Sequence, residues 1–163
     1  MDTVTVRRFK IEDIPIMISI WNEVVNEGNA FPQEEFLNEK TGAAFFASQS
    51  YCGVAEGEGG PLGLYILHPN NVGRCGHICN SSYAVSSRFR GRGIGEQLVR
   101  DCLEQAGKLG FRILQFNAVV ETNSRARSLY ERLGFQPLGS IPGGFRLPDG
   151  RFENIRPYYI ELC

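Results

Sequence analysis

The stretch from Val85 to Gly95, V-S-S-R-F-R-G-R-G-I-G, has the residue types of an anion-binding loop. An apolar segment ends at Val85, and a segment with helical periodicity begins at Ile94. Glycines let the backbone approach a ligand closely. The first turn of a helix adds unpaired N–H groups and the positive end of its dipole. We therefore expect a pyrophosphate to bind at Arg90, Gly91, Arg92, Gly93, Ile94, Gly95 and Glu96.

Two other phosphate-binding motifs share this physics, and the sequence disfavours both. No G-x-x-x-x-G-K-[ST] motif is present to hold a nucleoside triphosphate and magnesium. A dinucleotide fold would place the glycines after its first strand and an acidic residue at the end of the next strand. Here the loop follows several predicted strands, and Glu121 falls late for the acidic position.

Length and charge limit the classes of function. The chain has 163 residues, which predicts a single domain over residues 1–163. Its net charge of -1 gives no general attraction to nucleic acid or to an acidic membrane surface. No secretory signal or membrane-spanning run is apparent, so we expect a cytoplasmic protein with neither nucleic acid nor membrane as a partner.

Five cysteines without a paired pattern favour reduced thiols over disulfides. Cys75, His77 and Cys79 alternate closely enough to suggest a metal site. A structural zinc site needs four ligands and no second cluster is present. We therefore expect no metal, and interpret these residues as part of a strand with small buried thiols.

The first half of the chain predicts strands and one clear helix. A strand is expected around Val4 and Val6, and a helix capped by Asp13 should end at Gly28. Two helix-prone stretches follow, Glu34–Lys40 and Gly42–Gln49. Strands are then expected at Tyr51–Glu56, Leu62–Leu67 and His77–Val85.

The second half alternates helices and strands. Helices are expected from Ile94 to Leu109 and from Asn123 or Thr122 to Gly134. Strands are expected at Ile113–Val120, at Gln136–Ile141 and at Ile155–Leu162, and Gly143 and Gly144 should break the second of these. Antiparallel strands followed by strands joined through helices predict an α/β (α+β) fold, a mixed central β-sheet with helices on both faces.

A family resemblance sharpens this picture. R-G-R-G-I-G is similar to the first signature of the Gcn5-related N-acetyltransferase (GNAT) superfamily, and N-S-R-A-R-S-L-Y-E-R-L-G-F from Asn123 to Phe135 resembles its second. The resemblance covers about Gly76 to Ile141. It implies the GNAT fold, with a splay between the two central strands, and acetyl-CoA (coenzyme A) as cofactor.

The resemblance also implies roles for individual residues. The amides around Arg90 to Glu96 would hold the pyrophosphate, and Asn123 and Ala126 would contact the cofactor. An amide near Ala84 or Val85 would polarise the thioester carbonyl. Tyr130 matches the family's tyrosine, which contacts the cofactor and is thought to protonate the departing thiolate; without the resemblance it reads as a core aromatic. Implied cofactor-binding residues are therefore Ala84, Val85, Arg90, Gly91, Arg92, Gly93, Ile94, Gly95, Glu96, Asn123, Ala126 and Tyr130.

A narrower resemblance concerns the acceptor. H-I-C-N, F-N-A-V-V-E-T-N and L-G-S-I-P-G look like runs of the yeast azetidine-2-carboxylate (proline-analogue) N-acetyltransferases. In that subgroup the asparagines matching Asn80 and Asn117 are associated with the substrate. Two carboxamides can orient an amino acid's carboxylate and nitrogen. The alternative is that both are polar strand residues bonded to neighbouring backbone.

These observations predict transfer of the acetyl group of acetyl-CoA to a primary or secondary amine of a small amino-acid-like metabolite, by direct attack in a ternary complex. The alternatives are a protein or peptide N-acetyltransferase and a non-catalytic acetyl-CoA-binding sensor. The general base is open: His77, Glu27 or Glu121 could act through ordered water, or solvent could deprotonate the amine before it binds. A homodimer through the aromatic C-terminal residues Phe145, Phe152, Tyr158 and Tyr159 is a further expectation, with burial in the chain's own core as the alternative.

Overall fold

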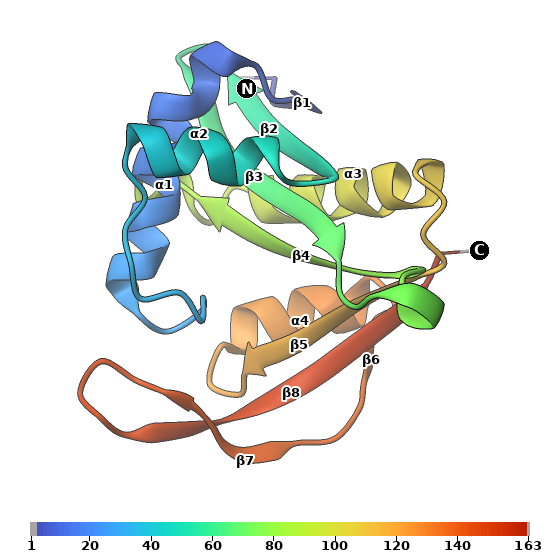
Figure 1. Cartoon of the computed structure of the whole chain (residues 1–163). Helices are drawn as coiled ribbons and strands as arrows, with labels where there is room; N and C mark the ends of the chain where they lie inside the picture. Colours follow the sequence, from blue (N-terminus) through green and yellow to red (C-terminus); the bar gives the residue numbers. More distant parts are fainter. Residues whose placement is uncertain (1–2, 163) are drawn as a thin grey trace.

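The computed structural model describes residues 3–162, which form one mixed sheet with helices on both faces (Figure 1). Eight strands make the sheet. They are β1 (Thr5–Arg8), β2 (Tyr51–Gly57), β3 (Gly60–Pro69), β4 (Ile78–Val85), β5 (Ile113–Val120), β6 (Gln136–Pro137), β7 (Ile141–Arg146) and β8 (Phe152–Glu161). Four α-helices connect them. These are α1 (Ile14–Glu27), α2 (Glu39–Ala47), α3 (Ile94–Lys108) and α4 (Ser124–Arg132).

The strands lie in the order β1-β2-β3-β4-β5-β8-β6, with β7 paired to β8. The pairing of β4 with β5 is parallel, and the other pairs are antiparallel. Parallel neighbours require a crossover, which α3 supplies. The predicted fold class is therefore confirmed, including its mixed sheet.

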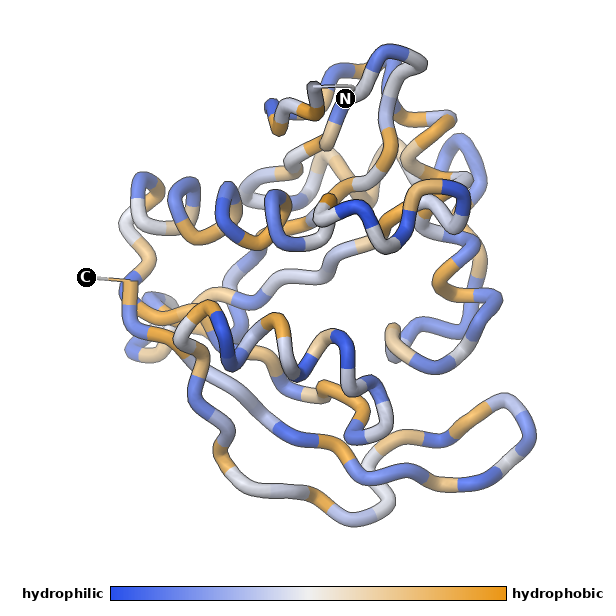
Figure 2. The backbone as a smooth tube through the Cα atoms, turned by 180° about the vertical axis from the view of Figure 1, so that it is seen from behind, coloured by the Kyte–Doolittle hydropathy of each residue, from blue (hydrophilic) through white to orange (hydrophobic). Residues whose placement is uncertain are grey.

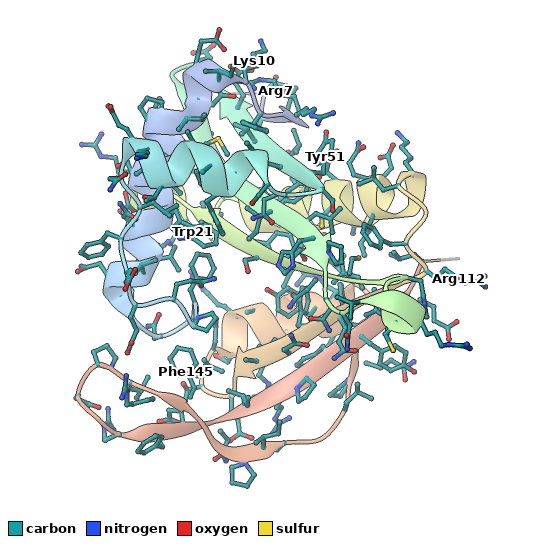
Figure 3. All side chains as sticks on the ribbon, viewed as in Figure 1. Arg7, Lys10, Trp21, Tyr51, Arg112 and Phe145 are labelled. Carbon is teal, nitrogen blue, oxygen red and sulfur yellow. The ribbon has the colours of Figure 1, made fainter. Side chains whose placement is uncertain are left out.

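Two apolar cores lie on the two faces of the sheet. Helices α1 and α2 cover one face, where Trp21 packs on Phe31, Phe45 and Phe46. Figure 3 shows Trp21 pointing inward from α1. Helix α3, together with Leu129 and Tyr130 of α4, covers the other face. Blue and orange alternate along α3 and α4 in Figure 2, as expected for helices with one buried side.

The structure corrects several predicted boundaries. Residues 34–38 form no helix, and one helix, α2, replaces the two predicted stretches because Asn38 caps it by accepting from the Thr41 N–H. Strand β7 runs through Gly143 and Gly144, and the break predicted there appears as a register shift in its pairing with β8, between Ile141 and Phe145. Strand β8 begins three residues early, at Phe152. The predicted strand 136–141 is split between β6 and β7.

The cysteine prediction is correct in part. The four cysteines that the structure describes are free thiols, and Cys79 is buried in β4. Cys75, however, is exposed in a 3₁₀ turn, and His77 is exposed just before β4, so neither is a buried strand residue. Within residues 3–162 no three metal-ligating side chains gather. No helix of this range is long and apolar enough to cross a membrane.

The sequence predicted that Asp13 caps α1, but the Asp13 side chain makes no capping hydrogen bond. Its carboxylate instead accepts from both terminal nitrogens of Arg7, at 2.7 and 3.0 Å, and from the Lys10 N–H. Arg7 also binds Glu56 of β2. Asp13 thus joins the start of α1 to the edge of the sheet, and the hydrogen bonds from Arg7 lower its pKa.

We expect Asp13→Asn to lower the free energy of unfolding by about 1–3 kcal/mol at neutral pH, since it leaves Arg7 without one charged partner. Because the folded-state pKa of Asp13 is lowered, its contribution is fully present above the unfolded pKa of ~3.9. It is lost as the pH falls through the folded pKa. Urea unfolding at several pH values measures this. The exposed Glu12→Gln is the control, and an equal loss at pH 3 and pH 7 would contradict the account.

Candidate active site

The central feature of the site is a gap in the middle of the sheet. Strands β4 and β5 pair only at Ile78 with Ile113 and at Cys79 with Leu114. Beyond those pairs β4 follows β3 up to Val85, while β5 follows β8 up to Val120. Figure 1 shows the two strands diverging. The splay predicted between the central strands is confirmed, and the facing edges of both strands keep backbone groups free to bind a ligand.

The glycine loop leads from β4 into α3 at the open end of this gap. Gly91 and Gly93 have φ angles of 79° and 77°, a conformation that favours glycine. A Cβ added at either residue would meet no atom within 4 Å, so the space beside them is open. Gly93 caps α3, and the first N–H groups of a helix have no partner within it. The loop therefore presents free amides to open space.

A cavity of about 670 Å³ lies against this loop, and we call it the loop cavity. Most of the predicted cofactor-binding residues line it. They are Val85, Arg90, Gly91, Gly93, Ile94, Gly95, Glu96, Asn123 and Ala126. The Asn123 side chain also caps α4, accepting from the Ala126 N–H at 3.3 Å. Two signatures distant in the sequence thus face each other across one cavity.

The loop arginines differ in their surroundings. The Arg90 side chain donates to the Val85 carbonyl oxygen at 3.1 Å and to Glu27 of α1 at 2.5 Å, so two of its three guanidinium nitrogens already have partners within the protein. Arg88 and Arg92 line a separate cavity beside α1, which we call the side cavity. Arg92 lies over the Phe89 ring there, 5.3 Å from its centroid. Phe89 lines both cavities, whereas Arg92 is not among the residues that line the loop cavity.

Sequence reasoning missed a second group of loop-cavity residues on α4. Arg125, Leu129 and Arg132 line the cavity and follow one another at spacings of four and three, which places them on one helical face. This spacing could have predicted from the sequence that the three residues share one face of α4. Arg132 is bound to Glu96 at 2.6 Å, which also binds Arg100. Arg125 is exposed and adds a positive charge to the cavity wall.

A second cavity of about 350 Å³ lies within the gap, and we call it the strand cavity. Tyr130 lines it, as do the predicted substrate residues Asn80 and Asn117. Tyr83, Asn123 and Ala126 line both this cavity and the loop cavity, so the two adjoin. The structure therefore brings Tyr130 together with both asparagines.

Tyr130 is half-buried in a group of aromatic rings. Its ring centroid lies 4.4 Å from that of Phe116 and 5.5 Å from that of Phe135. Burial raises the pKa of the Tyr130 phenol, so the group stays protonated at neutral pH and can donate a proton. No hydrogen bond within residues 3–162 uses its hydroxyl, in contrast to Tyr83, which accepts from Ser81 at 2.7 Å.

The two predicted asparagines meet through a third that the sequence did not single out. Asn70 donates to the Asn117 side-chain oxygen at 3.1 Å and accepts from its Nδ2 at 2.7 Å. Asn80 Nδ2 also donates to the Asn70 oxygen, at 3.2 Å. No sequence spacing reveals this contact, because Asn70 lies in the turn after β3. The three carboxamides form one connected group at the strand cavity.

The three candidate bases all lie outside the strand cavity. Glu27 lines the loop cavity and binds Arg90. Glu121 accepts from Arg156 and Asn154, and these hydrogen bonds lower its pKa. His77 is exposed. Each would therefore need a bridging water to take a proton from a molecule in the strand cavity.

The loop cavity fits a ligand that carries a pyrophosphate and a thioester arm. Free amides around two open glycines suit the pyrophosphate, and Arg125 adds positive charge. The free edge of β4 can bind an extended arm as an added strand would. The arm then ends near the strand cavity, beside Tyr130. Nothing in this geometry conflicts with the predicted cofactor.

Two curated relatives are similar to the chain in sequence. The N-acetyltransferase aca1 of Schizosaccharomyces pombe is 42% identical over 86 residues, a match that spans 53% of this chain and 41% of that protein. An L-methionine sulfoximine/L-methionine sulfone acetyltransferase of Pseudomonas aeruginosa is 26% identical over 145 residues, spanning 85% and 83% of the two chains.

Solved structures share the fold over nearly the whole chain. A GCN5-related N-acetyltransferase from Kribbella flavida is 31% identical, with a TM-score of 0.89 and 97% of each chain covered. A phosphinothricin acetyltransferase from Sinorhizobium meliloti, solved with acetyl-CoA, has a TM-score of 0.89 at 22% identity and covers 98% of this chain and 88% of its own.

The acetyltransferase (GNAT) family model matches residues 17–135, which include both sides of the gap and both cavity-lining signatures. Its members are enzymes that transfer acetyl groups, and their cofactor is acetyl-CoA. The match covers well over half of the chain and agrees with the fold and with the geometry of the loop cavity. The chain therefore belongs to the GNAT family of acetyltransferases.

Proposed function

We propose that the chain transfers the acetyl group of acetyl-CoA to the amine of a small amino-acid-like molecule, by direct attack in a ternary complex. The observation that carries this proposal is the junction of two cavities across the β4–β5 gap. One suits the cofactor and the other suits an acceptor. The family resemblance to the yeast azetidine-2-carboxylate enzymes supports the same acceptor class.

Two relatives support a small acceptor. The Pseudomonas aeruginosa protein is named for L-methionine sulfoximine and L-methionine sulfone, and the Sinorhizobium meliloti structure for phosphinothricin. The strand cavity, at about 350 Å³, lies at the lower end of the range of small-molecule sites, ~300–1,000 Å³. This volume favours a free amino acid over the N-terminus of a protein, and Tyr130 at the cavity favours an enzyme over a sensor.

The cofactor would supply an activated acetyl group, and the chain's residues hold it. Amides from Gly91 to Glu96 bind the pyrophosphate, and the α4 residues Asn123, Ala126 and Arg125 face it. Glu96 adds a negative charge to this wall, which Arg100 and Arg132 offset. Arg92 contributes through its backbone, since its side chain packs on Phe89.

The β4 register decides which amide can polarise the thioester carbonyl. The Ser86 N–H donates to Leu62 of β3, and N–H groups alternate in direction along a strand. The Val85 N–H therefore points into the gap, whereas that of Ala84 points to β3, opposite Leu64. We assign the polarising role to Val85, and one hydrogen-bond donor to a developing oxyanion contributes ~3 kcal/mol in other acyl transfers.

The remaining roles fall to residues of the strand cavity. Tyr130, protonated at neutral pH, donates its proton to the coenzyme A sulfur as the C–S bond breaks. Asn80 and Asn117 bind the acceptor's carboxylate through their amide groups, with Asn70 holding both in place. The carboxamides supply donors for a carboxylate without fixing a charge.

The proposal also includes a cytoplasmic location and a possible homodimer. Free thiols at the four described cysteines agree with a cytoplasmic location. A homodimer stays a prediction. Of the four C-terminal aromatics, Tyr158 and Phe145 are buried in this chain's own core, whereas Phe152 is 66% exposed and available to a partner. Figure 3 shows Phe145 on the C-terminal hairpin.

An acceptor screen tests the proposed function. We expect free coenzyme A to be released from acetyl-CoA in the presence of L-methionine sulfone, phosphinothricin or L-azetidine-2-carboxylate, measured by thiol titration. Asn117→Ala should raise the KM for the acceptor about tenfold or more, because a charge-assisted hydrogen bond is lost. Transfer to peptide N-termini but not to any amino acid would contradict the small-acceptor proposal.

Gly93→Asp tests the pyrophosphate site. A Cβ at Gly93 meets no atom, so the change places a carboxylate in open space beside the amides. We expect the affinity for acetyl-CoA to fall at least tenfold below that of Gly93→Asn, as measured by isothermal titration calorimetry. The asparagine variant is the matched control because it has the same shape without the charge. Equal affinities of the two variants would contradict the assignment.

Tyr130→Phe tests the proton donor. We expect kcat to fall by ~10² or more, as for loss of a general acid, with the dissociation constant of acetyl-CoA little changed. Stopped-flow assays across pH 6–10 measure kcat. Tyr159→Phe, on β8 outside both cavities, should retain full turnover. Full turnover of Tyr130→Phe with an unchanged pH profile would rule out the role.

A further inference from the structure

The strand cavity contains one histidine that the reaction as proposed so far does not use. His68 lies near the end of β3 and pairs across the ladder with Asn80 of β4. Cross-strand partners point to the same face of a sheet, so the His68 and Asn80 side chains lie side by side. His68 is half-buried and lines the strand cavity together with Asn80, Asn117 and Tyr130.

The tautomer of His68 follows from its one hydrogen bond within residues 3–162. Nδ1 lies 3.0 Å from the carbonyl oxygen of Pro69. A carbonyl oxygen only accepts, so Nδ1 carries the proton in this bond. In the neutral imidazole Nε2 then holds a free electron pair. A lone pair at an acceptor cavity is what removal of a proton from an amine requires.

The other groups at this cavity cannot take that role. No aspartate or glutamate lines the strand cavity, and its other titratable residues are Tyr83 of β4 and Tyr130 of α4. Burial raises the pKa of both phenols, which makes them donors at neutral pH. The loop before α2 contributes Phe31, Pro32 and Gln33, and β5 contributes Asn117 and apolar residues, so these elements bring no charge.

We propose that Nε2 of His68 is the general base that removes the proton from the acceptor ammonium. This inference rests on the proposed function. An ammonium loses two protons as its nitrogen forms the bond to the acetyl carbon. His68 takes one and passes it to solvent. Tyr130 gives its proton to the coenzyme A sulfur as the C–S bond breaks, and the second ammonium proton passes to the resulting Tyr130 phenolate. The nitrogen electron pair becomes the N–C bond, and the C–S pair stays on sulfur.

The chain offers a matched control, because it has two histidines and His77 is exposed and outside the strand cavity. We expect His68→Gln to lower kcat/KM at neutral pH by ~10² or more and to remove the acidic limb that a general base gives the pH profile. His77→Gln should keep both. The dissociation constant of acetyl-CoA should stay within about twofold in both variants, as expected for residues outside the loop cavity.

Nitrogen-15 NMR of histidine-labelled protein gives a second readout that needs no turnover. The two variants assign the two imidazoles. We expect neutral His68 to carry its proton on Nδ1, and we expect millimolar L-methionine sulfone to shift the His68 signals in the presence of coenzyme A while leaving those of His77 in place.

The outcomes separate this inference from the proposed function. If the wild-type protein acetylates no amine, the proposed function fails, and the NMR shifts alone decide whether His68 faces the acceptor. If the wild-type protein is active but His68→Gln keeps its rate and the acidic limb of its pH profile, the assignment of His68 as the base is overturned while the proposed function stands. A proton on Nε2 in the neutral form would also overturn it.

Discussion

Hydrogen bonding between β4 and β5 stops after Cys79 and Leu114, and the site depends on that interruption. Each strand remains supported on its other side, β4 by β3 and β5 by β8. The gap therefore costs only the pairing of two facing edges, whose backbone groups can instead bind a ligand. It also joins the loop cavity to the strand cavity, so that a donor and an acceptor can meet within the sheet.

Aromatic packing holds the gap open on the side of α3 and α4. Tyr83 of β4 lies 6.0 Å from Phe116 of β5, centroid to centroid, in an edge-on arrangement. Tyr130 of α4 packs against both rings and against Phe135. The packing of these rings fixes the position of the Tyr130 hydroxyl, because a large ring held by its neighbours cannot change rotamer freely. The aromatic cluster that stabilises this side of the sheet therefore also sets where the Tyr130 proton donor lies.

Sequence patterns predicted the parts of the site that local signals encode. The glycine loop, the Asn123 cap and the Tyr130 face of α4 each depend on residues within a few positions of one another, and the structure places them around the two adjoining cavities. Asn70 and His68 carry no local signal. They reach the site only through the register that pairs His68 with Asn80, and a register depends on tertiary packing. The predicted helix over 34–40 was wrong because the Asn38 cap starts the helix later.

The most direct test of this account is a crystal structure with acetyl-CoA and L-methionine sulfone bound. The account predicts the pyrophosphate on the amides of Gly91 to Glu96, the acetyl carbonyl oxygen near the Val85 N–H, and the acceptor nitrogen between His68 and Tyr130. A cofactor bound in the side cavity, against Arg88 and Arg92, or an acceptor bound outside the strand cavity, would contradict it.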